Sequence, residues 1–123
     1  MATLTLYERV GGEAFFVALV ARFYAGVAAD PLLRPMYPDD LTDARDHLAL
    51  FLVQYWGGPR TYSDTRGHPR LRMRHAPFVV DDAARDAWLS HMHDALDAVE
   101  LDADVRGEFD SYFEMAANQL RNA

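Results

Sequence analysis

Four long stretches of this 123-residue chain repeat apolar side chains at intervals of three and four residues. Such spacing places the apolar residues on one face of an α-helix. The predicted helices span about residues 13–29, 42–56, 82–100 and 103–121, and a shorter helix precedes the pair Gly11-Gly12. Because no stretch has a convincing strand pattern and no internal repeat is present, the sequence predicts an all-α fold.

Glycine and proline mark the breaks between these helices. The run Gly57-Gly58-Pro59 ends the 42–56 helix. Asp30 is predicted to cap a brief helical piece that begins at the proline after it, and Tyr37 is predicted to lie in a bend between two further prolines. Residues 60–68 have neither a helical nor a strand period, so they are predicted to form the longest irregular stretch.

The lengths of the helices also predict how they pack. Helix 13–29 is expected to pair with 42–56, and 82–100 with 103–121, as two hairpins that stack on each other. Helical proteins packed in this way can leave an apolar slot for a flat cofactor. A chain of this length has room for about one domain with a single core, so residues 1–123 are expected to form one domain.

Composition excludes several classes of function. The net charge of −7 and the pI near 5.0 argue against nucleic acid or an anionic membrane as the main partner. The absence of cysteine removes disulfides, thiolate metal sites, iron–sulfur clusters and thiol catalysis. No apolar run approaches a membrane span and no signal peptide is evident, so a cytoplasmic location is expected.

The run RLRMRHAPF at 70–78 contains His75, the histidine with the strongest case for a functional role. Pro77 stops any helix near Ala76, which leaves this imidazole at a helix end. There one ring nitrogen can bind a metal while the other donates to a backbone carbonyl. Taken alone, a histidine beside apolar residues is more often a hydrogen-bonded structural residue.

The simpler enzyme classes find no support in the other candidate residues. His91 and His93 are two positions apart on a helix and point to different sides, and no histidine pair has the spacing of a tetrahedral zinc site. The many carboxylates are scattered over exposed helix faces. No nucleophile elbow and no glycine-rich phosphate loop is present.

A haem site needs one axial imidazole, cations for two propionates and apolar walls. This chain offers His75, an arginine-rich region over residues 60–74 and the apolar slot. Donors that could hydrogen-bond a ligand on the opposite side of the iron are Tyr24, Tyr37 and Trp88, which lie on faces that also carry core residues. Each of the three, taken singly, is more often an ordinary core aromatic.

With these residues assembled, the sequence resembles the group II truncated haemoglobins, small globins with a two-on-two helical sandwich that encloses haem. The resemblance covers nearly the whole chain. Its most specific segments are QYWGGPRTYSDTRGHPRLRMRHAPF at 54–78, RDAWLSHM at 85–92 and RFYAGVAADPLLRPMYP at 22–38.

The resemblance assigns roles residue by residue. It makes His75 the proximal ligand of the haem iron, with Met73 and Phe78 as neighbours of the macrocycle. Trp88, Tyr24 and Tyr37 match the family's polar cluster around bound ligand. Ala44 stands where many globins have a distal histidine, so no distal histidine is expected. The remaining candidates are Arg74, Tyr62 and Arg66 for the propionates, Leu48 beside both cofactor and ligand, and Phe51 beside the cofactor.

The resemblance implies a protein that binds O2, and other diatomic ligands such as NO and CO, at a haem b iron. A redox enzyme that uses the same haem for NO dioxygenation or peroxide reduction is the alternative, and it would require an unidentified reductase. A haem-based gas sensor is disfavoured because no output domain is appended. A homodimer is left open by the sequence.

Overall fold

The computed structural model describes residues 4–66 and 80–121, and all their regular structure is helical. The elements in chain order are α1 (Leu6–Arg9), α2 (Glu13–Ala28), the 3-10 helix η1 (Arg34–Met36), α3 (Thr42–Tyr55), α4 (Thr61–Arg66), α6 (Asp82–Asp97) and α7 (Ala103–Leu120). The four predicted long helices and the all-α fold class are therefore confirmed. None of the helices in this part of the chain is both long and apolar enough to cross a membrane.

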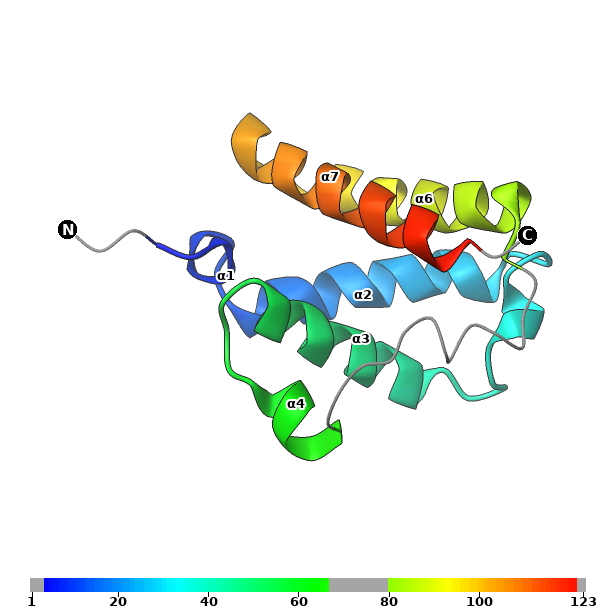
Figure 1. The fold of residues 1–123 in the computed structure, drawn as a ribbon, viewed down its shortest axis with the longest axis horizontal. Coiled ribbons are helices and arrows are strands. Elements are labelled where there is room, and N and C mark those ends of the chain that lie inside the picture. Colours follow the sequence, from blue (N-terminus) through cyan, green and yellow to red (C-terminus); the bar gives the residue numbers. More distant parts are fainter. Residues whose placement is uncertain (1–3, 67–79, 122–123) are drawn as a thin grey trace.

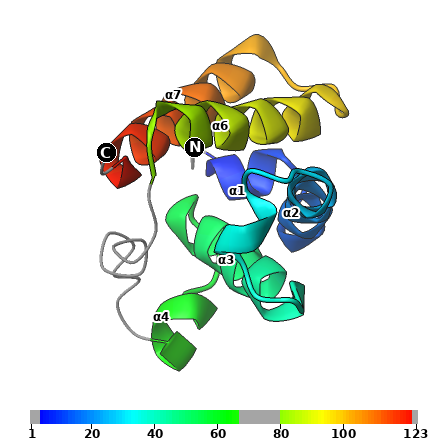
Figure 2. The same cartoon turned by 90° about the vertical axis from the view of Figure 1, so that its right-hand side faces the viewer.

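The long helices form two layers. Figures 1 and 2 show α6 and α7 side by side, lying over α2 and α3. The predicted pairing of hairpins is thus correct, and α2 also packs directly against α6 across the layers. Helix α4 lies beyond α3, on the side away from α6 and α7 (Figure 2). This arrangement brings residues of α2, α3, α6 and α7 to a shared interior.

Aromatic side chains fill much of the core. Phe16 and Phe23 of α2 and Phe109 and Phe113 of α7 are almost completely buried. Phe16 contacts Trp56 at the end of α3, with ring centroids 6.1 Å apart, and Phe109 lies 4.7 Å from the same indole. Burial of each such side chain contributes about 1.5–3 kcal/mol to folding.

The end of α3 depends on glycine. Gly57 has a φ of 99°, which side chains other than glycine rarely adopt, and a Cβ there would lie 2.8 Å from the Thr5 side chain. The close approach of Gly57 to Thr5 lets the N-H of Tyr7 donate to the Trp56 carbonyl at 3.0 Å, so α1 docks on the end of α3. This contact requires glycine at position 57, and it is the physical reason for the predicted break at the glycine pair.

Two local predictions need correction. Asp30 caps the segment as predicted, because its carboxylate accepts from the Leu32 N-H at 2.8 Å, but residues 31–33 form a turn and the brief regular piece is the 3-10 helix η1. Residues 61–66 are helical, although they lie in the stretch predicted to be irregular. Ser63 explains this difference, because both its backbone N-H and its hydroxyl bond the Gln54 side chain, at 2.9 and 2.7 Å.

Candidate functional site

A cavity of about 520 Å³ lies between the two helical layers. This volume falls within the range of roughly 300–1,000 Å³ that is typical of small-molecule and cofactor sites. Its lining residues, most of them apolar, are Tyr24, Leu33, Met36, Tyr37, Pro38, Ala44, His47, Leu48, Phe51, Leu52, Tyr62, Val80, Ala84, Arg85, Trp88, Tyr112, Phe113, Ala116, Ala117 and Leu120. A second hollow, at the turn between α6 and α7, is open and polar and contains none of the predicted site residues.

The three predicted donors meet at this cavity. Tyr24 comes from α2, Tyr37 from the bend that follows η1, and Trp88 from α6. The rings of the two tyrosines lie edge to face with centroids 5.6 Å apart. The chain thus brings together one indole and two phenols from three elements that are distant in sequence.

Hydrogen bonding and burial set the state of these donors. The Trp88 indole donates to the Tyr37 hydroxyl; that bond lowers the pKa of Tyr37, but the larger effect of burial raises it to about 12. Burial, and secondly the neighbouring Tyr37, raise the pKa of Tyr24 above its ordinary value. Both phenols therefore keep their protons at neutral pH and remain available as hydrogen-bond donors.

Helices α3 and α4 supply a predominantly apolar wall. Ala44, Leu48 and Phe51 line the cavity from α3. Tyr62 of α4 is 3% exposed and packs edge to face on Phe51, with ring centroids 5.6 Å apart. The packing of α4 on α3 therefore places Tyr62 at the cavity.

A histidine that the sequence analysis did not assign to the site also lines the cavity. His47 lies on α3, three residues after Ala44 and immediately before Leu48. The family resemblance singles out only the position of Ala44 as that of a distal histidine, so it does not identify His47. Its spacing of three residues from Ala44 was the signal that could have found it.

Helix α7 forms one side of the cavity, whereas its apolar pattern in the sequence predicted only a face that packs in the core. Tyr112, Phe113, Ala116 and Leu120 line it from this helix. The apolar periodicity of residues 103–121 identified this face, but periodicity does not distinguish contact with protein from contact with a cofactor. The small side chain of Ala116 helps to leave the space open.

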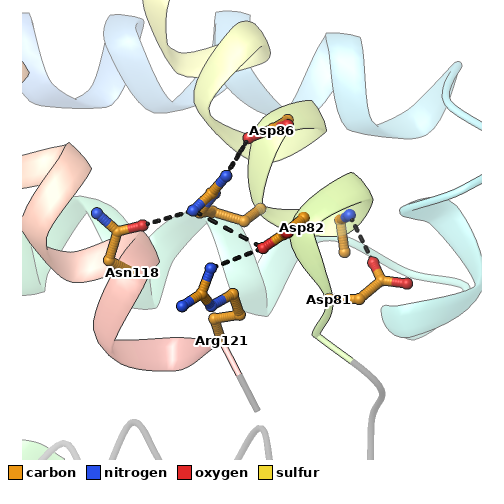
Figure 3. A network of polar contacts seen from close by, with 7 residues as sticks. Asp81, Asp82, Asp86, Asn118 and Arg121 are labelled. Carbon is orange, nitrogen blue, oxygen red and sulfur yellow. Dashed lines mark hydrogen bonds and ion pairs between the residues drawn. The ribbon is translucent and has the colours of Figure 1, made fainter. Parts of the chain in front are cut away.

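The start of α6 is held to the end of α7 by a polar network (Figure 3). The Arg85 guanidinium contacts Asp86 at 2.9 Å and Asn118 at 3.0 Å, and Arg121 contacts Asp82 at 2.7 Å. The hydrogen bond and charge of Arg121 lower the pKa of Asp82. Arg85 borders the cavity, and Trp88 follows it by three residues, so this network fixes the helix that carries the indole.

Four predicted site residues, His75, Arg74, Met73 and Phe78, lie outside the described residues. Arg66 occupies the last position of α4. All the other predicted site residues line the one cavity. Its apolar walls suit a flat macrocycle, and the cluster of donors suits a small polar ligand beside it, so the residues present fit a haem pocket.

Comparisons with known proteins agree with this fit. The model of the bacterial-like globin family matches residues 5–122. The chain is 43% identical to the Group 2 truncated hemoglobin YjbI of Bacillus subtilis over 116 residues, which cover 94% of this chain and 87% of that protein.

Solved structures have the same fold. A thermostable haemoglobin from Thermobifida fusca superposes with a TM-score of 0.94 at 54% identity and covers 98% of each chain. A truncated oxygen-avid haemoglobin from Bacillus subtilis superposes with a TM-score of 0.90 at 42% identity, covering 97% of this chain and all of that one. With this fold and this pocket, the chain belongs to the bacterial-like globin family as a group II truncated haemoglobin, a two-on-two globin that binds haem and O2.

Proposed function

We propose that this globin holds haem b in the 520 Å³ cavity and retains O2 reversibly through hydrogen bonds from Trp88, Tyr37 and Tyr24. Haem would supply a ferrous iron that binds a diatomic ligand. The residues of the chain determine how the cofactor is held and how long the ligand stays. The observation that carries the proposal is the convergence of the three donors on an otherwise apolar cavity.

In this proposal the cofactor is held from several sides. His75 would bind the haem iron, and Met73 and Phe78 would adjoin the macrocycle, as the family resemblance implies. Arg74, Arg66 and Tyr62 are proposed to bind the propionates, since guanidinium groups and phenols both donate to carboxylates. The assignment of Tyr62 has support from its position at the cavity. Leu48 and Phe51 are proposed to exclude water from the faces of the ring.

The donors act as a connected unit. Tyr37 accepts from the Trp88 indole, which leaves its own hydroxyl proton free to donate into the cavity. Tyr24 stands edge to face against Tyr37 and limits its rotation. A net hydrogen bond is worth about 1 kcal/mol, so each donor is expected to slow ligand release several-fold.

Oxygen binding is favoured over the redox alternative. The truncated haemoglobin of Bacillus subtilis that shares this fold is described as oxygen-avid. NO dioxygenation or peroxide reduction would also require a reductase to return the iron to its ferrous state. We further propose that residues 1–123 form one globin domain that works in the cytoplasm.

An absorption spectrum tests this function directly. The purified, reduced protein should show a Soret band that shifts on addition of O2 and again with CO. His75→Ala should abolish the normal haem spectrum, while Trp88→Phe should retain it and change only ligand kinetics. A wild-type protein that shows no Soret band after haem reconstitution, or an unchanged spectrum in His75→Ala, would contradict the corresponding assignment.

A further inference from the structure

A histidine and a carboxylate join α6 to the end of α2, outside the cavity. The Nε2 atom of His91 lies 2.7 Å from the Oδ2 atom of Asp30, and the two side chains are 21% and 17% exposed. Neither residue lines the cavity. The hydrogen bond from His91 is the main reason that the pKa of Asp30 is lowered, so the carboxylate is the ionised acceptor of this bond.

The imidazole lies directly against the backbone of α2. A Cβ atom placed on Gly26 would come within 2.5 Å of Nδ1 and 3.1 Å of Cγ of His91. The lack of a side chain at Gly26 therefore makes room for this ring in the α2–α6 contact. Such a close fit restricts the imidazole and aims Nε2 at Asp30.

Asp30 in turn organises the segment that leads to the donors. Its Oδ1 atom accepts from the Leu32 N-H at 2.8 Å, and its carbonyl accepts from the Arg34 N-H at 2.9 Å. The Arg34 guanidinium then donates to the carbonyls of Tyr37 and Pro38, at 3.3 and 2.8 Å. Hydrogen bonds therefore run without a gap from Asp30 to the backbone of Tyr37.

The other end of this segment returns to the same helix. The Tyr37 hydroxyl accepts from the Trp88 indole, and Trp88 precedes His91 by three residues, about one turn of α6. Residues 30–37 are thus fastened to α6 at both ends. A segment held at both ends samples fewer conformations than one held only at Tyr37.

We propose that His91 and Asp30 are positioning residues for ligand retention: their hydrogen bond sets the 30–37 segment on α6 and thereby holds Tyr37 against Trp88. This inference rests on the proposed function for its kinetic consequence only. The pair touches no ligand and acts through the placement of one donor. Loss of the pair should weaken the Trp88–Tyr37 contact without removing either residue.

Substitutions of His91 test this role with a matched control. His91→Leu removes the donor, and His91→Gln restores an amide N-H at a similar reach. His93→Leu changes a histidine two residues away on the same helix, whose Nε2 lies 3.7 Å from Asp110 of α7 and not near the 30–37 segment. Two readouts on the haem-loaded protein are the O2 dissociation rate, by stopped flow, and the ionisation of Tyr37, by absorption titration against the same variant carrying Tyr37→Phe.

We expect His91→Leu to speed O2 release about three- to tenfold. The Tyr37 ionisation should move to lower pH, because the loss of burial, which is the larger effect on this pKa, outweighs the loss of the indole hydrogen bond, which alone would raise it. His91→Gln should restore most of both values, and His93→Leu should leave both unchanged. Asp30→Ala should have at least the effect of His91→Leu, because it also removes the acceptor of the Leu32 N-H, and the double variant should show little change beyond Asp30→Ala.

Two results would overturn the proposal. One is a Tyr37 ionisation that is the same in His91→Leu as in the wild type. The other is a double variant whose effects simply add, since the residues would then act independently. If the protein failed to bind O2, the proposed function would fail, but the Tyr37 titration would still decide whether this pair positions the phenol.

Discussion

The indole N-H of Trp88 on α6 donates to the hydroxyl of Tyr37 in the bend after η1, across the wall of the cavity. The single N-H of the indole therefore orients the Tyr37 hydroxyl, and a bound ligand would have to share or take over that N-H. The two side chains cannot be treated as independent contributions to ligand retention. This relationship predicts the order in which substitutions at the cavity speed O2 release.

Trp88→Phe should speed O2 release more than Tyr37→Phe or Tyr24→Phe. Replacement of the indole removes one donor and frees Tyr37 to rotate, which is equivalent to losing about two hydrogen bonds of ~1 kcal/mol, or roughly 10- to 30-fold in rate. Each tyrosine variant loses one donor and should change the rate about fivefold. Stopped-flow dissociation rates measure the order directly, and a larger effect at either tyrosine would refute the ranking.

Trp56→Phe is the matched control for that series. Trp56 packs among Phe109, Phe113 and Tyr112 and does not line the cavity. Its replacement by a smaller aromatic ring should lower stability but leave the O2 dissociation rate within about twofold of wild type. A large kinetic change in this variant would mean that packing defects, and not donors, control release.

The stability of the protein should fall between about pH 10 and pH 12, partly because of Tyr37. Burial raises the pKa of this phenol to about 12, whereas the unfolded chain ionises near pH ~10. Its contribution is fully present below pH ~10 and is lost as the pH rises toward 12, at about 1.4 kcal/mol for each pH unit. Urea unfolding at a series of pH values should show a shallower decline for Tyr37→Phe, and parallel curves would contradict the assignment.

Gly57→Ala should destabilise the fold by about 1–3 kcal/mol. The backbone at Gly57 has a φ of 99°, and the added methyl group would approach the Thr5 side chain to 2.8 Å. Gly107→Ala is a suitable comparison, because a Cβ on Gly107 meets nothing within 4 Å and alanine is the better helix former by about 1 kcal/mol. Thermal unfolding should therefore move in opposite directions for the two variants, and the same direction in both would be inconsistent with the strain at Gly57.

The long helices could be predicted because each has one apolar face, and such a face specifies both the helix and its side of the core. Leu19, Phe23 and Val27 of α2 follow this pattern and are buried. Tyr24, Tyr37 and Trp88 could be named as candidate donors from their side chains, but an apolar pattern does not distinguish them from core aromatics, and only the family resemblance assigns them to a cluster around the ligand.

What could not be predicted depends on contacts between distant residues. Thr61–Arg66 has no helical period of its own and is helical where Gln54 bonds Ser63. The pair of His91 and Asp30 joins residues 61 positions apart, and neither residue type nor local spacing indicates such a partner. Hydrogen bonds of this kind become visible only when the packing of α2 on α6 is known.

The contact between Gln54 and Ser63 yields a last prediction about the cavity wall. The Gln54 side chain holds both the N-H and the hydroxyl of Ser63, and thereby docks the start of α4, with buried Tyr62, against α3. Gln54→Ala should lower the free energy of unfolding by about 1–3 kcal/mol, because it leaves the Ser63 N-H without its partner. Ser63→Ala keeps that backbone bond and should cost only about 1 kcal/mol.

The same two variants test whether α4 helps to hold the cofactor. Since Tyr62 lines the cavity, loosening of α4 in Gln54→Ala should speed haem loss to an excess of an acceptor apoprotein, and Ser63→Ala should do so less. Urea unfolding of each variant supplies the stability against which haem loss is compared. If Gln54→Ala were destabilised as expected but released haem at the wild-type rate, Tyr62 would be a packing residue of α4 with no part in retaining the cofactor.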